Sequence, residues 1–414
     1  MINDLPSRLG AVIATTLLVT SIGVADDEDI PGATGTDVRV IEDSLEARTS
    51  DPIRIEDARV LVFDGPPGLP RILPIDEVLA IAIGPVTSRE TILSDRTADS
   101  RAGDDVAITA PYLDLVDGQR IPGTLSSGDD GRPVWRSAWL KDIPLDLDRI
   151  SSVRFSPGGE KVPVASEADI VVLANGDRLE GLVDDVGLEV VIETDGPDGD
   201  ANVVRVPIDR VASISLVNPM ERPAGAMTWV RGGHRILSDS VRIADDGYIT
   251  LVAPKVGGDI AEIPLDFLVA TVLDASRVLP LANQKIATLD AGSSDALRPW
   301  IPEPKASPGH HAFGAAPIRL DGPLRVIFDL PSDGGRFSTT VERPMESGSG
   351  RMTLHVLDDG RRVRSVVIDQ DDPVHRLVVE FQSDSLGIEI ESGDDGPFRD
   401  SIVLREAIIV RPRE

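Results

Sequence analysis

The 414-residue sequence contains no cysteine, which excludes disulfides and thiolate metal sites. Aromatic residues make up only 3% of the chain, and there are only 5 histidines. Stability must therefore come from aliphatic side chains packed in more than one core. The 37 glycines and 32 prolines, among many Val, Ile and Leu residues, favour short strands joined by turns. The composition predicts an all-β fold.

Positive charge is also scarce, because 41 Lys and Arg residues face 70 Asp and Glu residues, for a net charge of −29. Such a chain repels phosphate backbones, so nucleic acid is not expected as a partner. The sequence also lacks Gly-x-Ser-x-Gly, His-Glu-x-x-His and P-loop motifs. We therefore expect a protein that is not an enzyme.

An apolar run from Ala11 to Val24 ends in small residues before the acidic segment that begins at Asp26. Residues 1–25 are predicted to be a signal peptide, which implies a secreted or periplasmic bacterial protein. The alternative is an uncleaved membrane anchor, but the run is short for a membrane span, and no later stretch approaches that length. Residues 26–50 are predicted to be an acidic, disordered segment.

A Pro-apolar-Asp phrase occurs four times and marks an internal repeat. The copies are Leu73-Pro74-Ile75-Asp76, Ile143-Pro144-Leu145-Asp146, Val206-Pro207-Ile208-Asp209 and Ile263-Pro264-Leu265-Asp266. The intervals between the prolines are 70, 63 and 57 residues (74→144→207→264). They predict β units at residues 51–108, 109–160, 165–220 and 225–278. The first unit is degenerate, because it lacks the Gly-Asp-Arg element of the others.

Each later unit opens with a predicted hairpin. Asn175-Gly176, Asp117-Gly118 and Gly232-Gly233 are expected to form two-residue type I′ turns. With the strands that follow, each unit forms a small barrel or curled sheet. The units resemble the Sm-like and SH3-like small β units of exported bacterial proteins. Their four repeat aspartates are expected to cap their own turns rather than to bind metal or to catalyse a reaction.

Residues 281–414 differ, because an irregular lead-in at 281–312 is followed by seven alternating apolar runs. This pattern predicts a β-sandwich. From His310 to Val410 the sequence resembles the NPCBM family of carbohydrate-binding modules, which have a galactose-binding-like jelly-roll fold. The shared phrases are His311-Ala312-Phe313-Gly314, Val326-Ile327-Phe328-Asp329-Leu330, Gly335-Arg336-Phe337-Ser338, Leu357-Asp358-Asp359-Gly360-Arg361, Val367-Ile368-Asp369, Arg376-Leu377-Val378-Val379-Glu380 and Asp400–Ile408.

The resemblance implies a sugar-binding jelly roll, although Val403 stands where the family has Trp. Sugars stack on exposed aromatic rings. Phe328, Phe337 and Phe381 occupy inward-type strand positions and are expected in the core. The candidate ligand-binding residues are Phe398, Phe313, Trp300 and His311, of which His311 has either a structural or a binding role. Asp394, Asp395 and Asp400 are candidate ligands for a structural calcium ion; no other cofactor is expected.

The sequence thus predicts a secreted, non-catalytic protein. Its jelly roll binds a polysaccharide or another glycan of the cell envelope, and its β repeats serve as a spacer or docking array. The alternative is a structural or assembly protein of the envelope that binds a protein partner. A third hypothesis is an accessory part of a glycoside hydrolase system. No membrane span is expected after signal cleavage.

Cleavage of the signal peptide gives the first testable prediction. N-terminal sequencing of the exported protein should begin at Asp26, because Gly23 and Ala25 are small residues that suit signal peptidase. A mature protein that retains Met1 would contradict this prediction.

Overall fold

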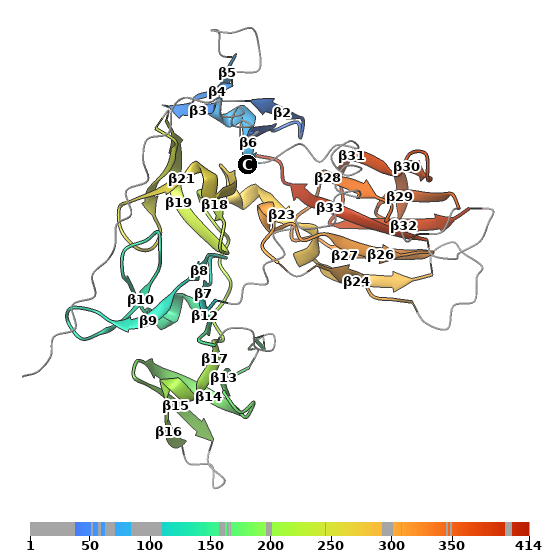
Figure 1. Ribbon diagram of the computed structural model, residues 1–414. Coiled ribbons are helices and arrows are strands. Elements are labelled where there is room, and N and C mark those ends of the chain that lie inside the picture. The colour runs from blue at the N-terminus through green and yellow to red at the C-terminus, as the bar shows by residue number, and fades with distance from the viewer. Residues whose placement is uncertain are drawn as a thin grey trace, which may run out of the picture. The chain divides into compact units, whose positions relative to one another are not determined.

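The computed structural model describes residues 38–413 except 51–52, 57–58, 63–70, 84–109, 157–161, 164, 166, 196–200, 245, 292–300, 308, 345–346, 348–349 and 394–399. The predicted signal peptide and residues 26–37 lie outside the described residues. Strands joined by short 3₁₀ turns make up the regular structure of the described part (Figure 1). The predicted fold class, small β units followed by a jelly-roll sandwich, is confirmed.

Three β units share one plan, in which four strands (five in the second unit) are followed by a 3₁₀ turn and a closing strand. The second contains β7 (Tyr112–Leu115), β8 (Arg120–Pro122), β9 (Thr124–Ser127), β10 (Pro133–Arg136), β11 (Ile143–Pro144), η2 (Leu147–Arg149) and β12 (Ile150–Arg154). The third contains β13 (Asp169–Leu173), β14 (Arg178–Val186), β15 (Glu189–Asp195), β16 (Ala201–Pro207), η3 (Ile208–Arg210) and β17 (Val211–Ser215). The fourth contains β18 (Ala226–Val230), β19 (His234–Ile243), β20 (Tyr248–Pro254), β21 (Ile260–Pro264), η4 (Leu265–Phe267) and β22 (Leu268–Val272).

The opening hairpins of the second and third units use a different turn from the one predicted. Leu173 O accepts from Gly176 N at 2.9 Å, and Leu173 N donates to Asp177 O at 2.8 Å. In this turn Gly176 has a positive φ of 90°, and Asn175 does not. The loop is therefore a type I turn closed by a glycine bulge, not a type I′ turn, because the hairpin has one residue more than a two-residue loop. A type I′ turn does occur in the jelly roll at Asp359-Gly360, where φ is 47° and 72°.

A sharp bend in the second strand curls the third unit. β14 pairs with β13 through residues 178–181 and with β15 through residues 182–186. Gly181 sits where the strand changes partners, and a Cβ added there would lie 2.0 Å from Glu193 O. Only glycine allows this approach of two backbones. Apolar side chains from all four units then share one continuous core.

The first unit begins earlier than predicted. Residues 38–50, expected to be disordered, form the hairpin of β1 (Val38–Glu42) and β2 (Ala47–Ser50). Leu45, with φ of 67°, takes the glycine position, and its N donates to Glu42 O at 2.9 Å. A leucine in this conformation gives no sequence signal of a turn. The unit continues with β3 (Ile53–Glu56), β4 (Arg59–Val62), β5 (Arg71–Pro74), η1 (Ile75–Glu77) and β6 (Val78–Ile83).

Neighbouring units join through their closing strands. β6 pairs antiparallel with β22, and β12 pairs antiparallel with β17. Ile81 lies opposite Thr271, and Val153 lies opposite Ile214. Each of these residues is fourth in its strand, so equivalent positions meet and each pair of units has a local two-fold relation. The first unit thus pairs with the fourth, and the second with the third.

The jelly roll consists of two antiparallel sheets around a separate core. We call the first the docking sheet, with the order β25-β26-β33-β28-β31, and β23 also pairs with β33. Its strands are β23 (Val278–Pro280), β25 (Lys305–Ala306), β26 (Ile318–Asp321), β28 (Gly335–Glu342), β31 (Val374–Phe381) and β33 (Ser401–Val410). The second, the polar sheet, has the order β24-β27-β32-β29-β30. Its strands are β24 (Lys285–Asp290), β27 (Leu324–Asp329), β29 (Met352–Asp358), β30 (Arg361–Ile368) and β32 (Ser385–Ser392).

The sandwich confirms the strand pattern of the tail but not its irregular lead-in. Phe328, Phe337 and Phe381 are buried in the core, as predicted. However, β24 lies within the lead-in and pairs with β27 at the edge of the polar sheet. Its burial is low, because it is an edge strand, so its sequence lacks a clear apolar alternation.

The repeat aspartates do not all cap their turns. Asp146 precedes η2 and accepts from Asp148 N at 3.3 Å. In the other three described turns, proline is the N-cap residue and makes no side-chain cap hydrogen bond. In these turns the aspartate is the second residue of the turn, two positions after the cap residue. These residues are Asp76, Asp209 and Asp266. The prediction of four capping aspartates is therefore wrong for three of them.

This difference predicts unequal costs for the same substitution. Asp146→Ala should lower the free energy of unfolding by about 0.5–1 kcal/mol, because a cap is lost. Asp209→Ala should change it by less than about 0.5 kcal/mol, as expected for a surface position. Urea denaturation of both variants tests this. An equal loss from the two substitutions would contradict the assignment.

Candidate functional site

One face of the docking sheet packs against the β units. Ile408 and Val410 point out of β33, away from the sandwich core, into a third apolar cluster. Leu45 and Leu79 enter it from the first unit, and Trp229 enters it from the fourth. Leu45 is only 2% exposed, so burial accounts for a leucine at a turn position that favours glycine. The jelly roll is thus fastened to two β units by apolar contact.

Ion pairs surround this apolar cluster. Arg39 on β1 binds both carboxylate oxygens of Glu406 on β33, at 3.2 and 2.8 Å. Asp43, in the turn between β1 and β2, pairs with Arg277 at 2.6 Å, and its carbonyl accepts from Arg336 at 3.1 Å. Burial would raise the pKa of Glu406, but Arg39 outweighs it and lowers that pKa, with help from Arg376. The docked arrangement therefore holds Glu406 in its charged form.

The structure places the predicted ligand-binding residues as follows. Phe313 is 1% exposed, and its ring packs edge-on against Trp229 at 6.2 Å between centroids. The prediction that Phe313 is an exposed platform is wrong, because docking against the fourth unit covers it. His311 is half-buried, immediately before η7 (Ala312–Gly314). Trp300 and Phe398 lie outside the described residues.

The candidate calcium ligands are not brought together by anything the structure describes. Asp400 is 2% exposed, whereas Asp394 and Asp395 lie outside the described residues. Among the described residues there is no group of three or more His, Asp or Glu side chains that could hold a metal ion. Calcium at this loop stays a prediction.

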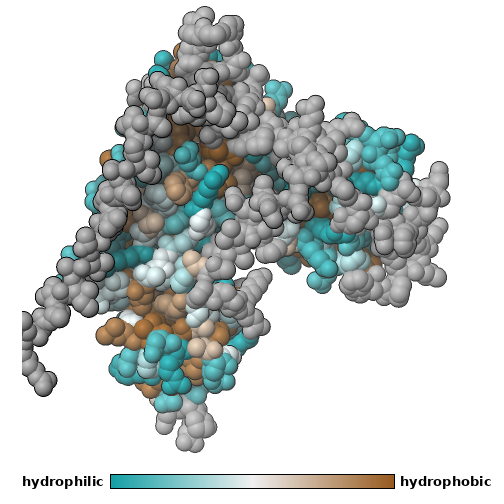
Figure 2. Space-filling model, viewed as in Figure 1, coloured by the Kyte–Doolittle hydropathy of each residue, from teal (hydrophilic) through white to brown (hydrophobic). Residues whose placement is uncertain are grey.

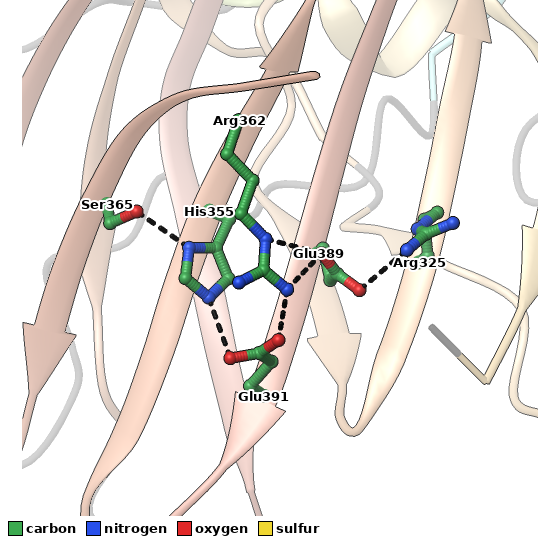
Figure 3. Close-up of polar contacts among 6 residues, drawn as sticks. All are labelled: Arg325, His355, Arg362, Ser365, Glu389 and Glu391. Atoms are coloured by element: carbon green, nitrogen blue, oxygen red, sulfur yellow. Dashed lines mark hydrogen bonds and ion pairs between the residues drawn. The ribbon is translucent and has the colours of Figure 1, made fainter. Parts of the chain in front are cut away.

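The outer face of the polar sheet carries a network of charged side chains (Figure 3). Glu389 on β32 is 1% exposed and accepts from Arg325 at 2.9 Å and from Arg362 at 3.0 Å. Arg362 also binds Glu391, which lies two residues along the same strand face. His355 completes the network through Glu391 Oε2 at 3.0 Å and Ser365 Oγ at 2.7 Å.

Strand alternation explains how this network forms. Alternate residues of β32 point into the core, namely Leu386, Ile388 and Ile390. Glu389 and Glu391 occupy the other positions and therefore point outward. Arg325 and His355 lie directly opposite Glu389 on the two neighbouring strands. Sequence reasoning did not single out these residues. The sequence shows the alternation of charged and apolar residues, but it does not show which strands are neighbours in the sheet.

The network offers directional hydrogen bonds but no stacking platform. Charged donors and acceptors bind hydroxyl, carboxylate or peptide groups, and the Arg362 side chain is 43% exposed. Burial would lower the pKa of Arg362, but hydrogen bonds to Glu391 and Glu389 outweigh it and raise that pKa. Among the described residues of this sheet, the only Trp, Tyr or Phe is Phe328, which points into the core. In the view of Figure 2, hydrophilic atoms cover much of the described jelly-roll surface.

Comparisons with known proteins define no family for this chain. No family model and no curated protein matches the sequence. The CBM51 module of Clostridium perfringens GH95, solved with methyl-galactose, is 15% identical, and the match covers 32% of this chain and 99% of that chain at a TM-score of 0.26. The CBM51-2 and INT domains of Clostridium perfringens ZmpB, solved with GlcNAc, are 13% identical over 45% of this chain and 43% of that chain, at 0.27.

A cycloalternan-forming enzyme from Listeria monocytogenes, solved with a pentasaccharide substrate, is 9% identical over 63% of this chain and 30% of that chain, at a TM-score of 0.22. Scores this low support no inference, so the fold rests on the strand order of the chain itself. Among the described residues, no helix is long and apolar enough to cross a membrane.

The Arg39–Glu406 pair predicts a pH-dependent contribution to stability. Because Arg39 is buried, Glu406→Gln should lower the free energy of unfolding near neutral pH by about 3 kcal/mol. The pKa of Glu406 is lower in the folded than in the unfolded chain, so the pair stabilises above the ordinary glutamate pKa of about 4.3. That stability is lost as the pH falls through the lowered value.

Denaturation of the wild type and the variant between pH 7 and pH 3.5 tests this prediction, and their difference should shrink with acidity. Glu380→Gln is the matched control, because Glu380 pairs with Arg336 at 3.0 Å but its side chain is 67% exposed. An exposed pair should contribute less than about 1 kcal/mol. A loss from Glu406→Gln that does not depend on pH would contradict the role of this ion pair.

Proposed function

We propose that this chain is an exported, non-catalytic binding protein whose polar sheet binds a polysaccharide of the cell envelope. In this proposal the β units form a base to which the jelly roll is fixed. The proposal is carried by the observation that the two sheets of the jelly roll have different surroundings. The docking sheet turns Ile408 and Val410 toward the β units, and the opposite sheet carries the Glu389 network on its own outer face.

The resemblance of residues 310–410 to carbohydrate-binding modules supports a sugar as the ligand. Guanidinium and carboxylate groups arranged across neighbouring strands suit the paired hydroxyls of a sugar ring. Since the described residues of this face offer no aromatic ring for stacking, we expect a weak affinity, with a Kd of about 1 mM for a single site. Repetition of the sugar along a polysaccharide would strengthen attachment to a surface.

A second function is assembly with a protein of the envelope. It is favoured by the exposed ends of the network, because the Arg362 and Glu391 side chains are 43% and 32% exposed and can each approach an opposite charge on a partner. An accessory role beside a glycoside hydrolase is compatible with either ligand.

Polysaccharide binding by the full chain tests the proposal. Affinity electrophoresis against a panel of envelope polysaccharides should show retardation of the wild type. Arg362→Ala should weaken it at least tenfold, because Arg362 joins both carboxylates of the network. Arg364→Ala is the matched control, since Arg364 is an exposed arginine on the same strand that lies outside the network.

Thermal melting of both variants checks that each remains folded. Retardation that both variants retain would assign binding to another face. Failure of the wild type to bind any polysaccharide would overturn the proposed function and favour the protein partner.

A further inference from the structure

Two arginines face each other at the junction of the second and fourth β units. Arg120 on β8 and Arg235 on β19 are directly opposite in the pairing that joins these units. Like charges opposite each other in an antiparallel pair repel and destabilise the pair. Gln119 holds the junction in place, because its side-chain oxygen accepts from Leu237 N at 2.9 Å. The two guanidinium groups are therefore kept together by a rigid contact beside them.

One carboxylate is shared by these two arginines, so the pair keeps one excess positive charge. Asp114 binds Arg120 through both oxygens, at 2.6 and 2.7 Å, and also accepts from Ser152 at 3.3 Å. Its nearest approach to Arg235 is 3.8 Å, which is too long for a hydrogen bond. Burial lowers the pKa of Arg235. The attraction of Asp114 opposes this shift, and the repulsion of Arg120 adds to it. The junction has a local excess of positive charge in a protein of net charge −29.

Buried polar atoms without partners collect on the same face. Trp229 lies opposite Arg235 on β18, so both side chains share one side of the sheet. Trp229 Nε1 and Arg235 Nε are buried and have no hydrogen-bond partner within the described part of the chain. A buried donor of this kind is costly unless something accepts from it.

The loop between β25 and β26 of the jelly roll, which contains η7, covers this face. Phe313 packs on Trp229, and a Cβ added at Gly314 would lie 3.9 Å from Trp229 Nε1. His310, three residues before Phe313, has a buried Nε2 that also finds no partner in the described residues. Burial, followed by the charges of Arg235 and Arg120, lowers the pKa of His310 to about 4. The imidazole is therefore neutral at pH 7 and able to donate one hydrogen bond.

We propose that Arg120, Arg235, Trp229 and His310 form a binding site for a small oxyanion: a carboxylate, sulfate or phosphate group. The anion would accept from Arg235 Nε, from the Trp229 indole and from His310, and it would neutralise the second arginine. The Arg120 and Arg235 side chains are 26% and 27% exposed, so the site is open to solvent at one side. This site lies where the second and fourth β units meet the loop between β25 and β26, and it contains no residue of the polar sheet.

Calorimetric titration of the full chain with phosphate, sulfate and glucuronate, at constant ionic strength, tests the proposal. At least one anion should bind saturably, and Arg235→Gln should weaken its affinity at least tenfold. Arg242→Gln is the matched control, because Arg242 is an exposed arginine further along β19. Saturation separates binding from the general stabilising effect of sulfate on folded proteins.

Thermal melting without added anion gives a second readout. Arg235→Gln should melt no lower than the wild type, because the substitution removes one of two opposed charges. A lower melting temperature together with unchanged anion binding would show that Arg235 serves the fold alone, and would overturn the proposal. So would the absence of saturable binding for all three anions.

The relative affinities identify the source of the anion. Glucuronate binding at least tenfold tighter than phosphate would indicate the carboxylate of an acidic sugar, and the reverse order would indicate a free inorganic anion. Either order supports an oxyanion site. The Arg362→Ala variant should bind the anion like the wild type, so failure of one proposal leaves the other intact.

Discussion

The closing strand of each β unit is the element on which the structure depends. It pairs on one edge with the first strand of its own unit and on the other with the closing strand of a neighbour, as β22 does with β18 and β6. Both edges are thereby satisfied, so the small units avoid an exposed edge at this position. The Pro-apolar-Asp turn before each closing strand sets where that strand begins, which explains why this phrase repeats.

Pairing of the first unit with the fourth also creates the surface that receives the jelly roll. Ala82 and Ala270 lie opposite each other in that pairing, with Trp229 opposite Ala270 on the next strand. Small residues beside a large ring leave room for Phe313 and for the outward side chains of β33. The same face of the fourth unit also carries Arg235, which lies opposite Arg120 of the second unit, and the Trp229 indole, which has no partner among the described residues. Apolar docking and anion binding would therefore share one face of the fourth unit.

Most strands could be predicted, because a strand that is buried on one side shows its alternation locally. The seven apolar runs of the tail correspond to strands from β27 to β33. The candidate site was less predictable. Glu389 and Arg325 are 64 residues apart and meet only because β27 and β32 are neighbours. The hairpin at Leu45 was missed because the burial that stabilises a leucine there comes from residues far along the chain.

The sequence by itself determined the all-β class, the repeat, the positions of most strands and the two-part organisation. Each of these depends on residues close together in the chain, whose spacing sets which side of a strand they occupy. Only the tertiary structure decided which face of the jelly roll is covered, that Phe313 is buried, and that Arg120 and Arg235 stand opposite each other. Exposure and charge pairing depend on the partner surface, and that surface is supplied by other units that are distant along the chain.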